Sequence, residues 1–117
     1  MCPRNSEGRM DRTERIAALN DQIRRDHSRG KVVITRGIQA LGHQAILDVL
    51  AAVAAFSDFT PDNDPYAEHD CAVMTIGSHR VIWKVDYYDP DLNFASDDPA
   101  NPAVTIRVLT IMLADEY

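Results

Sequence analysis

Apolar residues recur at helical spacing near the start of the chain. Asp11 and Glu14 lie three residues apart just before this pattern, as the polar residues of a capping box do. The apolar stripe that follows consists of Ile16, Leu19 and Ile23. This pattern predicts a helix over residues 12–28. The opposite face of the predicted helix carries five arginines, Arg12, Arg15, Arg24, Arg25 and Arg29. We interpret them as a solvated face, with a basic docking face as the alternative.

A strand and a second helix are predicted next. Residues 31–35 form a β-branched run between Gly30 and Gly37, which predicts a buried strand. Helical spacing then recurs through an alanine-rich segment, at Ile46, Val49, Leu50, Val53 and Phe56. It predicts a second helix over residues 42–56. Residues 57–69 follow with two prolines and several turn-forming residues, and they are predicted to form a long loop.

The middle of the chain predicts a β-hairpin. Two β-type runs, residues 70–76 and 79–88, are separated by Gly77-Ser78, which suits a two-residue type II′ turn. Such a turn fixes the register, pairs Ile76 with His79 and sends alternate residues to one core face. That face comprises Ala72, Met74, Ile76, Val81, Trp83, Val85 and Tyr87. We interpret Trp83 as a core residue, with stacking on a ligand ring as the alternative.

The last segment is apolar almost all round. Asn101-Pro102 follows a turn-rich loop, and this pair is typical of a helix start. The run after it predicts a third, deeply buried helix that ends near Asp115. The predicted order is therefore α-β-α-β-β-α. The fold class is α+β, with a small antiparallel, hairpin-containing sheet packed against helices.

Composition places the chain among small proteins of one domain. The 117 residues predict a single domain over residues 11–117, preceded by a flexible leader over residues 1–10. The longest apolar run, residues 45–56, is far shorter than the roughly 20 residues that span a bilayer, so no membrane span is expected. Cys2 and Cys71 are interpreted as free thiols, which fits a cytoplasmic protein.

Charge divides the chain into two unlike parts. Residues 1–57 hold nine Lys or Arg against six Asp or Glu, a net charge of +3, and residues 58–117 hold three against twelve, a net charge of −9. The acidic part repels phosphate backbones, so direct nucleic-acid binding is not expected, whereas a basic protein partner or cations would be attracted. The alternative is that the charge only keeps the protein soluble.

Candidate chemistry lies on the polar face of the hairpin. The register places His69 beside Asp86, with Lys84 two residues earlier on the same face. A histidine next to a carboxylate is the minimal unit of general-base catalysis, so these three residues are the catalytic candidates. Asp62, Asp64, His69 and Asp86 are the candidate ligands of a divalent cation. A structural His-Asp pair is the alternative to both. No cofactor is predicted.

Common catalytic motifs are absent from the sequence. It contains no P-loop, no glycine-rich dinucleotide fingerprint, no paired-cysteine zinc motif and no serine nucleophile elbow. Asp89-x-Asp91-x-Asn93 begins like an EF-hand loop, but Phe94 and Ala100 replace its Gly and Glu. These observations exclude the easily recognised nucleotide-binding and hydrolase classes.

Four segments carry a resemblance to a known family. They are residues 59–66 (FTPDNDPY), 68–70 (EHD), 83–89 (WKVDYYD) and 108–117 (VLTIMLADEY). With them, the chain from about Arg12 to its end resembles DUF3768, a bacterial family of uncharacterised proteins. The resemblance implies kinship and a shared site, and no reaction. Members of the family tend to have Gly at position 67 and Phe-Gly at positions 71 and 72, where this chain has Ala67 and Cys71-Ala72.

These observations favour a small accessory protein that acts by binding. It would engage a protein partner through acidic loops 57–70 and 86–101, and a basic nucleic-acid-binding protein is the partner considered. The predicted binding residues are Asp62, Asn63, Asp64, Tyr66, Glu68, His69, Asp70, Lys84, Asp86, Tyr88 and Asp89. The competing hypothesis is a metal-assisted or general-base enzyme that uses Asp62, Asp64, His69 and Asp86. An oligomerisation module is a third, and the sequence leaves the oligomeric state open.

Overall fold

The computed structural model describes residues 11–117, and the predicted leader lies outside them. Its centre is one four-stranded sheet in the order β1-β4-β3-β2. The strands are β1 (Lys31–Ile34), β2 (Cys71–Ile76), β3 (His79–Tyr88) and β4 (Ile106–Leu113). β1 runs parallel to β4, and the other neighbours are antiparallel. The α+β fold class predicted from the sequence is confirmed.

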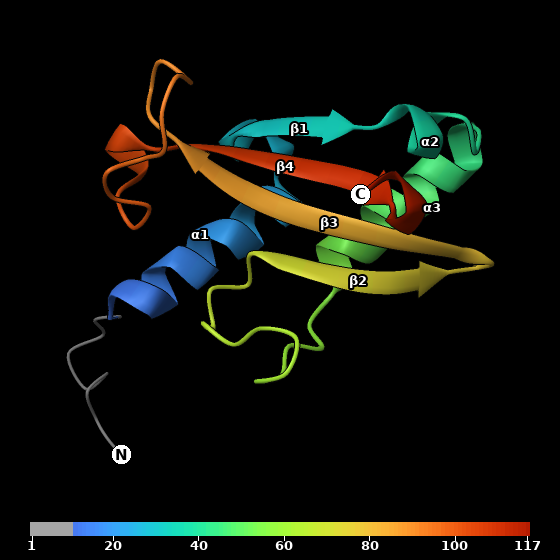
Figure 1. The fold of residues 1–117 in the computed structure, drawn as a ribbon, viewed down its shortest axis with the longest axis horizontal. Coiled ribbons are helices and arrows are strands. Elements are labelled where there is room, and N and C mark those ends of the chain that lie inside the picture. The colour runs from blue at the N-terminus through green and yellow to red at the C-terminus, as the bar shows by residue number, and fades with distance from the viewer. Residues whose placement is uncertain (1–10) are drawn as a thin grey trace.

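Helices cover one face of this sheet. They are α1 (Arg12–Arg25), the single turn α2 (Arg36–Gln39) and α3 (His43–Ala55). In Figure 1, α1 and α3 lie behind the strands, which form the front layer. Short 3₁₀ turns follow α1 (η2, His27–Arg29), precede β4 (η3, Pro102–Val104) and follow β4 (η4, Ala114–Glu116). No helix within residues 11–117 is long and apolar enough to cross a membrane.

The start of α1 has the predicted capping box. The Asp11 side chain accepts a hydrogen bond from the Glu14 amide at 2.8 Å, and the Glu14 side chain accepts one from the Asp11 amide at 3.1 Å. These two bonds satisfy amide groups that have no partner inside the helix. The helix ends three residues earlier than predicted. One of its arginines, Arg24, is buried, so the prediction that all five are solvated is wrong for that residue.

The hairpin follows the predicted register. Ile76 pairs with His79, and the ladder runs back to Cys71 opposite Lys84. Gly77 has a φ of +61°, a conformation that the first central position of a type II′ turn requires and that glycine adopts without steric cost. Trp83 is fully buried in the core, as predicted. The core cluster consists of Ile23, Ile38, Val49, Val53, Ala72, Val81, Trp83, Val85, Leu109 and Ile111.

The predicted third helix is wrong, because residues 106–113 form the inner strand β4 between β1 and β3. The segment is rich in β-branched residues, which lose side-chain freedom in a helix and pack well on a pleated sheet. Its burial alternates along the strand, and Arg107, Leu109 and Ile111 face the helices. The predicted cap at Asn101 is present, but it begins only the single turn η3.

β1 is also less buried than predicted. It is an edge strand that pairs only with β4, and its residues alternate between exposed and half-buried. Val33 is 46% exposed on the sheet face away from the helices. A buried strand was predicted from its β-branched run, but such a run does not distinguish an inner strand from an edge strand.

Candidate functional site

A polar network joins α1 to the loop over residues 57–70. Its first member is Arg24, which is buried between α1 and the sheet. The Arg24 guanidinium donates to the carbonyl oxygens of Val53 at 2.6 Å and Phe56 at 2.9 Å, at the end of α3. It donates to the Asp21 carboxylate at 2.6 Å and lies 4.8 Å from the Trp83 ring centroid. A buried charge is tolerated there because it has an ionic partner and helix-terminal acceptors.

His69 is the second member, and it fixes the loop to α1. Its Nδ1 atom lies 3.0 Å from a carboxylate oxygen of Asp21, and its Nε2 atom lies 3.8 Å from an oxygen of Asp64. The ring stacks on Phe59, with 3.8 Å between ring centroids and an angle of 3° between planes. The His69 backbone amide donates to the buried Asp64 carboxylate. Both ring nitrogens therefore face carboxylates, and one ring face is covered.

The predicted pairing of His69 with Asp86 is wrong. His69 has a φ of +55°, so the chain leaves the extended conformation two residues before β2 begins. The hairpin register therefore does not determine where its side chain points, and the imidazole turns to α1. Asp86 instead accepts from the Lys84 ammonium at 3.1 Å, a contact that raises the pKa of Lys84.

The candidate metal ligands are not brought together. Asp64 and His69 are neighbours, but Asp62 is exposed and Asp86 pairs with Lys84. Across residues 11–117, no three His, Cys, Asp or Glu side chains are grouped so that they could hold a metal ion. The arrangement that the structure shows is a set of ion pairs and hydrogen bonds between α1 and the loop.

A second branch of the network continues into the sheet. The Asn20 amide donates to the Tyr87 hydroxyl at 2.8 Å and to the Glu68 carbonyl oxygen at 3.0 Å. The Tyr87 hydroxyl donates to the Glu68 carboxylate at 3.1 Å. Arg107 donates to the Asn20 side-chain oxygen at 2.7 Å and to the Pro99 carbonyl oxygen. Burial raises the pKa of Tyr87 and lowers the pKa of Arg107. The branch links the loop, α1, β3 and β4.

The remaining predicted binding residues have separate positions. Asn63 shapes the loop, because its side chain accepts from the Thr60 amide at 2.8 Å and donates to the Asp58 carbonyl oxygen at 2.8 Å. Tyr66 projects into solvent and is 77% exposed. Asp89 caps a turn by accepting from the Asn93 amide at 3.0 Å, and the half-buried Tyr88 forms an isolated bridge with Ala95.

Asp70 lies among other acidic groups at the start of the hairpin. Burial raises its pKa, and the charges of Glu68, Asp64 and Asp86 add to the rise. Burial also raises the pKa of the neighbouring Cys71 thiol, with contributions from Asp70 and Asp64. The carboxylates at this end of the hairpin therefore repel one another.

Asp70→Asn is expected to stabilise the protein at pH 7 by about 0.5 kcal/mol, because the ionised carboxylate opposes folding there. Because the Asp70 pKa is higher in the folded than in the unfolded protein, folding favours the protonated carboxyl group. The carboxyl group therefore does not oppose folding below the unfolded pKa, and it does so increasingly as the pH rises through the folded pKa. The advantage of Asn should therefore fade as the pH falls towards 3.8, the ordinary value for Asp. Thermal denaturation from pH 3 to 7 measures this. Asp62→Asn, on an exposed carboxylate, should change little, and a loss of stability on Asp70→Asn at pH 7 would contradict the expectation.

Ala67 has a φ of +58°, in the left-handed region that favours glycine. The side-chain methyl group costs about 1–2 kcal/mol in this conformation, while glycine loses about 0.5–1 kcal/mol more chain entropy on folding. Ala67→Gly is therefore expected to raise the free energy of unfolding by about 0.5 kcal/mol in denaturant titrations. Ala51→Gly, at an exposed position inside α3, should lower it by about 1 kcal/mol. An equal loss at both positions would show that the loop does not hold this backbone conformation.

Sequence reasoning missed the contributions of α1 and β4 to this network. The missed residues are Asn20, Asp21, Arg24 and Arg107. A signal was present for some of them, since Asn20 lies within the apolar stripe, four residues after Ile16 and three before Ile23. Arg107 is the single charge in an apolar run and shares the face of Leu109 and Ile111. A polar residue on an apolar stripe indicates a buried hydrogen-bonding network.

The structure defines a small α+β protein in which a buried polar network fixes an acidic loop to the helical face of a mixed sheet. A model of the family DUF3768, described as a protein of unknown function, matches residues 34–116, and the chain belongs to this family. The family resemblance predicted from the sequence is confirmed. No match was found among the curated proteins or among the solved structures.

Proposed function

We propose that this protein acts by binding a basic protein surface through its two acidic loops. Loops 57–70 and 86–101 each carry five carboxylate side chains and no Lys or Arg. The first leads into the start of β2 and the second follows the end of β3, and these strands are antiparallel neighbours. Both loops therefore lie at one end of the sheet (Figure 1), so their negative potentials add.

Each acidic loop also exposes an aromatic side chain. Tyr66 in the first is 77% exposed and Phe94 in the second is 73% exposed. Large aromatic side chains are enriched among the residues that contribute most to protein–protein affinity, and surrounding charges steer a partner of opposite sign. An exposed aromatic ring within a carboxylate-rich loop is therefore a suitable anchor for a basic surface.

The main observation in support of the proposal is that contacts with α1 hold loop 57–70 in place. His69 binds it to α1 through Asp21, and Asp64 and Asn63 bond it internally, while Tyr66 and Asp62 remain exposed. A loop that is already ordered loses little conformational entropy when it binds. The buried network thus has a consequence for recognition, since it presents the outer residues in one fixed arrangement.

The partner class follows from the sign of the charge. Clustered Lys and Arg side chains are the electrostatic mark of nucleic-acid-binding proteins, because such clusters neutralise phosphate backbones. A nucleic acid presents negative phosphates and aromatic bases to such a protein. The acidic end of this protein presents negative carboxylates and exposed aromatic rings, so it offers the same two features. We therefore propose a basic nucleic-acid-binding protein as the partner, with its nucleic-acid site as the surface bound.

The test is affinity capture from a bacterial lysate with two charge-matched variants. The loop variant carries Asp58→Asn, Asp62→Asn and Tyr66→Ala, and the control carries Asp48→Asn and Asp115→Asn. All four aspartates are outside β-strands, and the control pair lies away from the acidic end, on α3 and η4. Wild type and control are expected to retain the same basic protein, and duplex DNA should displace it, while the loop variant should retain none. Capture that is equal for both variants, or that DNA leaves unchanged, would contradict the proposal.

General-base catalysis has less support from the geometry. The 3.0 Å contact of His69 Nδ1 with Asp21 is the arrangement that orients a catalytic imidazole. However, Nε2 faces a second carboxylate, that of Asp64, and Phe59 covers one ring face. A base must reach a substrate proton, and here both nitrogens already face protein groups. The contacts of His69 fit the fixation of the loop better.

A further inference from the structure

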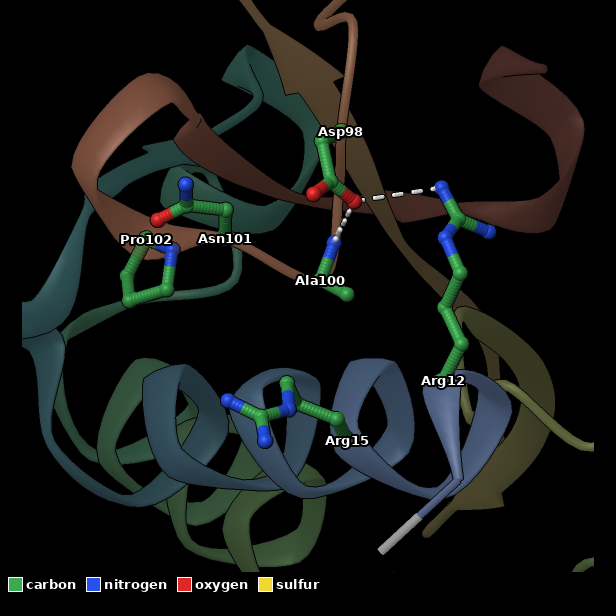
Figure 2. A pocket seen from close by; sticks show the side chains of 6 residues that line it. All are labelled: Arg12, Arg15, Asp98, Ala100, Asn101 and Pro102. Atoms are coloured by element: carbon green, nitrogen blue, oxygen red, sulfur yellow. Dashed lines mark hydrogen bonds and ion pairs between the residues drawn. The ribbon is translucent and has the colours of Figure 1, made fainter.

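A cavity of about 550 Å³ lies between α1 and the segment over residues 98–102. It is lined by Arg12, Arg15, Asp98, Ala100, Asn101 and Pro102. Figure 2 shows α1 along one side of the cavity and Asp98, Ala100 and Asn101 on the other. Its volume is within the range of small-molecule sites, but its lining is cationic in a chain whose net charge is −6. It is therefore chemically distinct from the acidic loops.

The segment over residues 98–102, which forms the side of the cavity opposite α1, is held in place by hydrogen bonds of Asp98. The Asp98 amide donates to the Ser96 hydroxyl at 3.1 Å, and the Thr105 hydroxyl donates to the Asp98 carbonyl oxygen at 2.7 Å. The Asp98 carboxylate accepts from the Ala100 amide at 3.2 Å and holds the Arg12 guanidinium at 3.3 Å (Figure 2). The cavity is thus formed before any ligand arrives, and one of its cations is already positioned.

Arg15 supplies a cation that Asp98 does not neutralise. It lies three residues after Arg12 on the same side of α1, and Figure 2 shows its guanidinium beside the cavity. Within residues 11–117, no hydrogen bond or ion pair is formed by its side chain. Since the one carboxylate of the lining is engaged by Arg12, the cavity retains an excess of positive charge.

A second cavity of about 340 Å³ lies further along α1 and shares Pro102 with the first. The second cavity is lined by Leu19, Gln22, Ser28, Arg29, Pro102, Thr105 and Arg107. Pro102 belongs to both linings, and the α1 residues at positions 12, 15, 19 and 22 form one stripe of the helix. We refer to these two neighbouring cavities together as the groove; both linings contain arginines, and the apolar Leu19 and Pro102 also belong to them.

We propose that this groove binds a small phosphate monoester, whose phosphate group contacts Arg12 and Arg15. A phosphate monoester carries a charge of about −1.5 to −2 and has three oxygens that accept hydrogen bonds, so it can contact both Arg15 and the Arg12 guanidinium that Asp98 holds. Guanidinium groups donate paired hydrogen bonds to phosphate oxygens in a fixed planar geometry. The organic part of the ligand extends along Leu19 and Pro102. The site joins α1, outside the family-matched residues 34–116, to a loop within them.

The test uses the full chain, labelled with ¹⁵N, and phenyl phosphate as the probe at low ionic strength. The backbone amide signals of Arg12, Arg15 and Asn101, and the guanidinium signals of the two arginines, are expected to shift and to saturate as the probe concentration rises. Arg15→Gln, which keeps most of the side-chain length, should weaken binding about tenfold or more, equivalent to about 1.4 kcal/mol. Arg25→Gln removes an exposed charge from the same helix outside the linings and should leave affinity unchanged. Inorganic phosphate should bind the same residues more weakly than phenyl phosphate, because it does not contact Leu19 or Pro102.

Three results would overturn the proposal. The first is the absence of saturable shifts at about 10 mM probe, the concentration at which a millimolar site is nearly filled. The second is an equal loss of affinity in Arg15→Gln and Arg25→Gln, which would indicate general attraction to a basic helix. The third is binding of benzoate as tight as that of phenyl phosphate, which would show that the site does not select phosphate. None of these results depends on whether the acidic loops bind a protein.

Discussion

Trp83→Ala is expected to lower the free energy of unfolding by about 3–5 kcal/mol, a large part of the stability expected of a chain of 117 residues. The indole is fully buried at the centre of the sheet. Phe56 and Phe59 contact it edge-on, with ring centroids 6.0 and 6.1 Å away, and the Arg24 guanidinium lies 4.8 Å from its centroid. Removal of the ring leaves a cavity and takes a packing partner from both aromatic rings. Guanidinium chloride denaturation monitored by circular dichroism measures the loss.

Two control variants separate cavity formation from general damage to the hairpin. Val73→Ala, at an exposed position of β2, should change the stability by no more than about 0.5 kcal/mol. Trp83→Phe keeps an aromatic ring and removes no hydrogen bond, because the indole N–H has no hydrogen-bond partner among residues 11–117. Its loss should therefore be clearly smaller than that of Trp83→Ala. A loss under about 1 kcal/mol for Trp83→Ala would show that the ring is not a core element.

The elements that sequence reasoning predicted well depend on short-range chemistry. The capping box of Asp11 and Glu14 and the turn at Gly77 involve residues at most three positions apart. The hairpin register follows from that turn, and the burial of Trp83 follows from the register. These predictions needed no knowledge of the rest of the chain.

The elements that were predicted wrongly depend on long-range packing. The run at 106–113 is apolar on both faces, and its spacing alone does not distinguish a buried helix from an inner strand. Its place is set by β1 and β3, which are far away in the sequence. The β-branched residues Val108, Thr110 and Ile111 favour a strand, whereas the preceding Asn101-Pro102 pair is typical of a helix start.

The sequence indicated loop 57–70 and His69, but it did not indicate the α1 residue that His69 contacts. Loop 57–70 is the acidic loop that the sequence indicated, and His69 does contact a carboxylate. The partner is Asp21, which is 48 positions away on α1, and no local rule relates the two residues. The positive φ of His69 removes it from the strand pattern on which the predicted contact with Asp86 depended. Side-chain pairing across a loop needs the tertiary structure.

Arg24→Ala is expected to lower the free energy of unfolding by about 3–5 kcal/mol, because it removes the buried member of an ion pair with the half-buried Asp21. The change removes the Arg24 donor from two carbonyl oxygens at the end of α3. The Val53 oxygen keeps a bond from the Phe56 amide at 3.4 Å, and the Phe56 oxygen loses its Arg24 bond, where a buried unsatisfied group costs about 1–3 kcal/mol. The change also leaves the Asp21 carboxylate with His69 as its remaining partner. Denaturant titration measures the loss, and Arg25→Ala, at the exposed neighbouring position, should stay within about 0.5 kcal/mol of wild type.

A double-mutant cycle shows whether Arg24 and the loop act together. Asp21 contacts both Arg24 and His69. If it links them, the stability lost in the Arg24→Ala, Asp21→Ala double variant should differ from the sum of the two single losses by about 0.5–3 kcal/mol. Cleavage of loop 57–70 by a protease should accelerate in both single variants, since each releases the contacts that fix the loop to α1. Additive losses, or unchanged cleavage in Asp21→Ala, would mean that Arg24 stabilises only the end of α3. The fixed loop on which the proposed binding function rests would then need another cause.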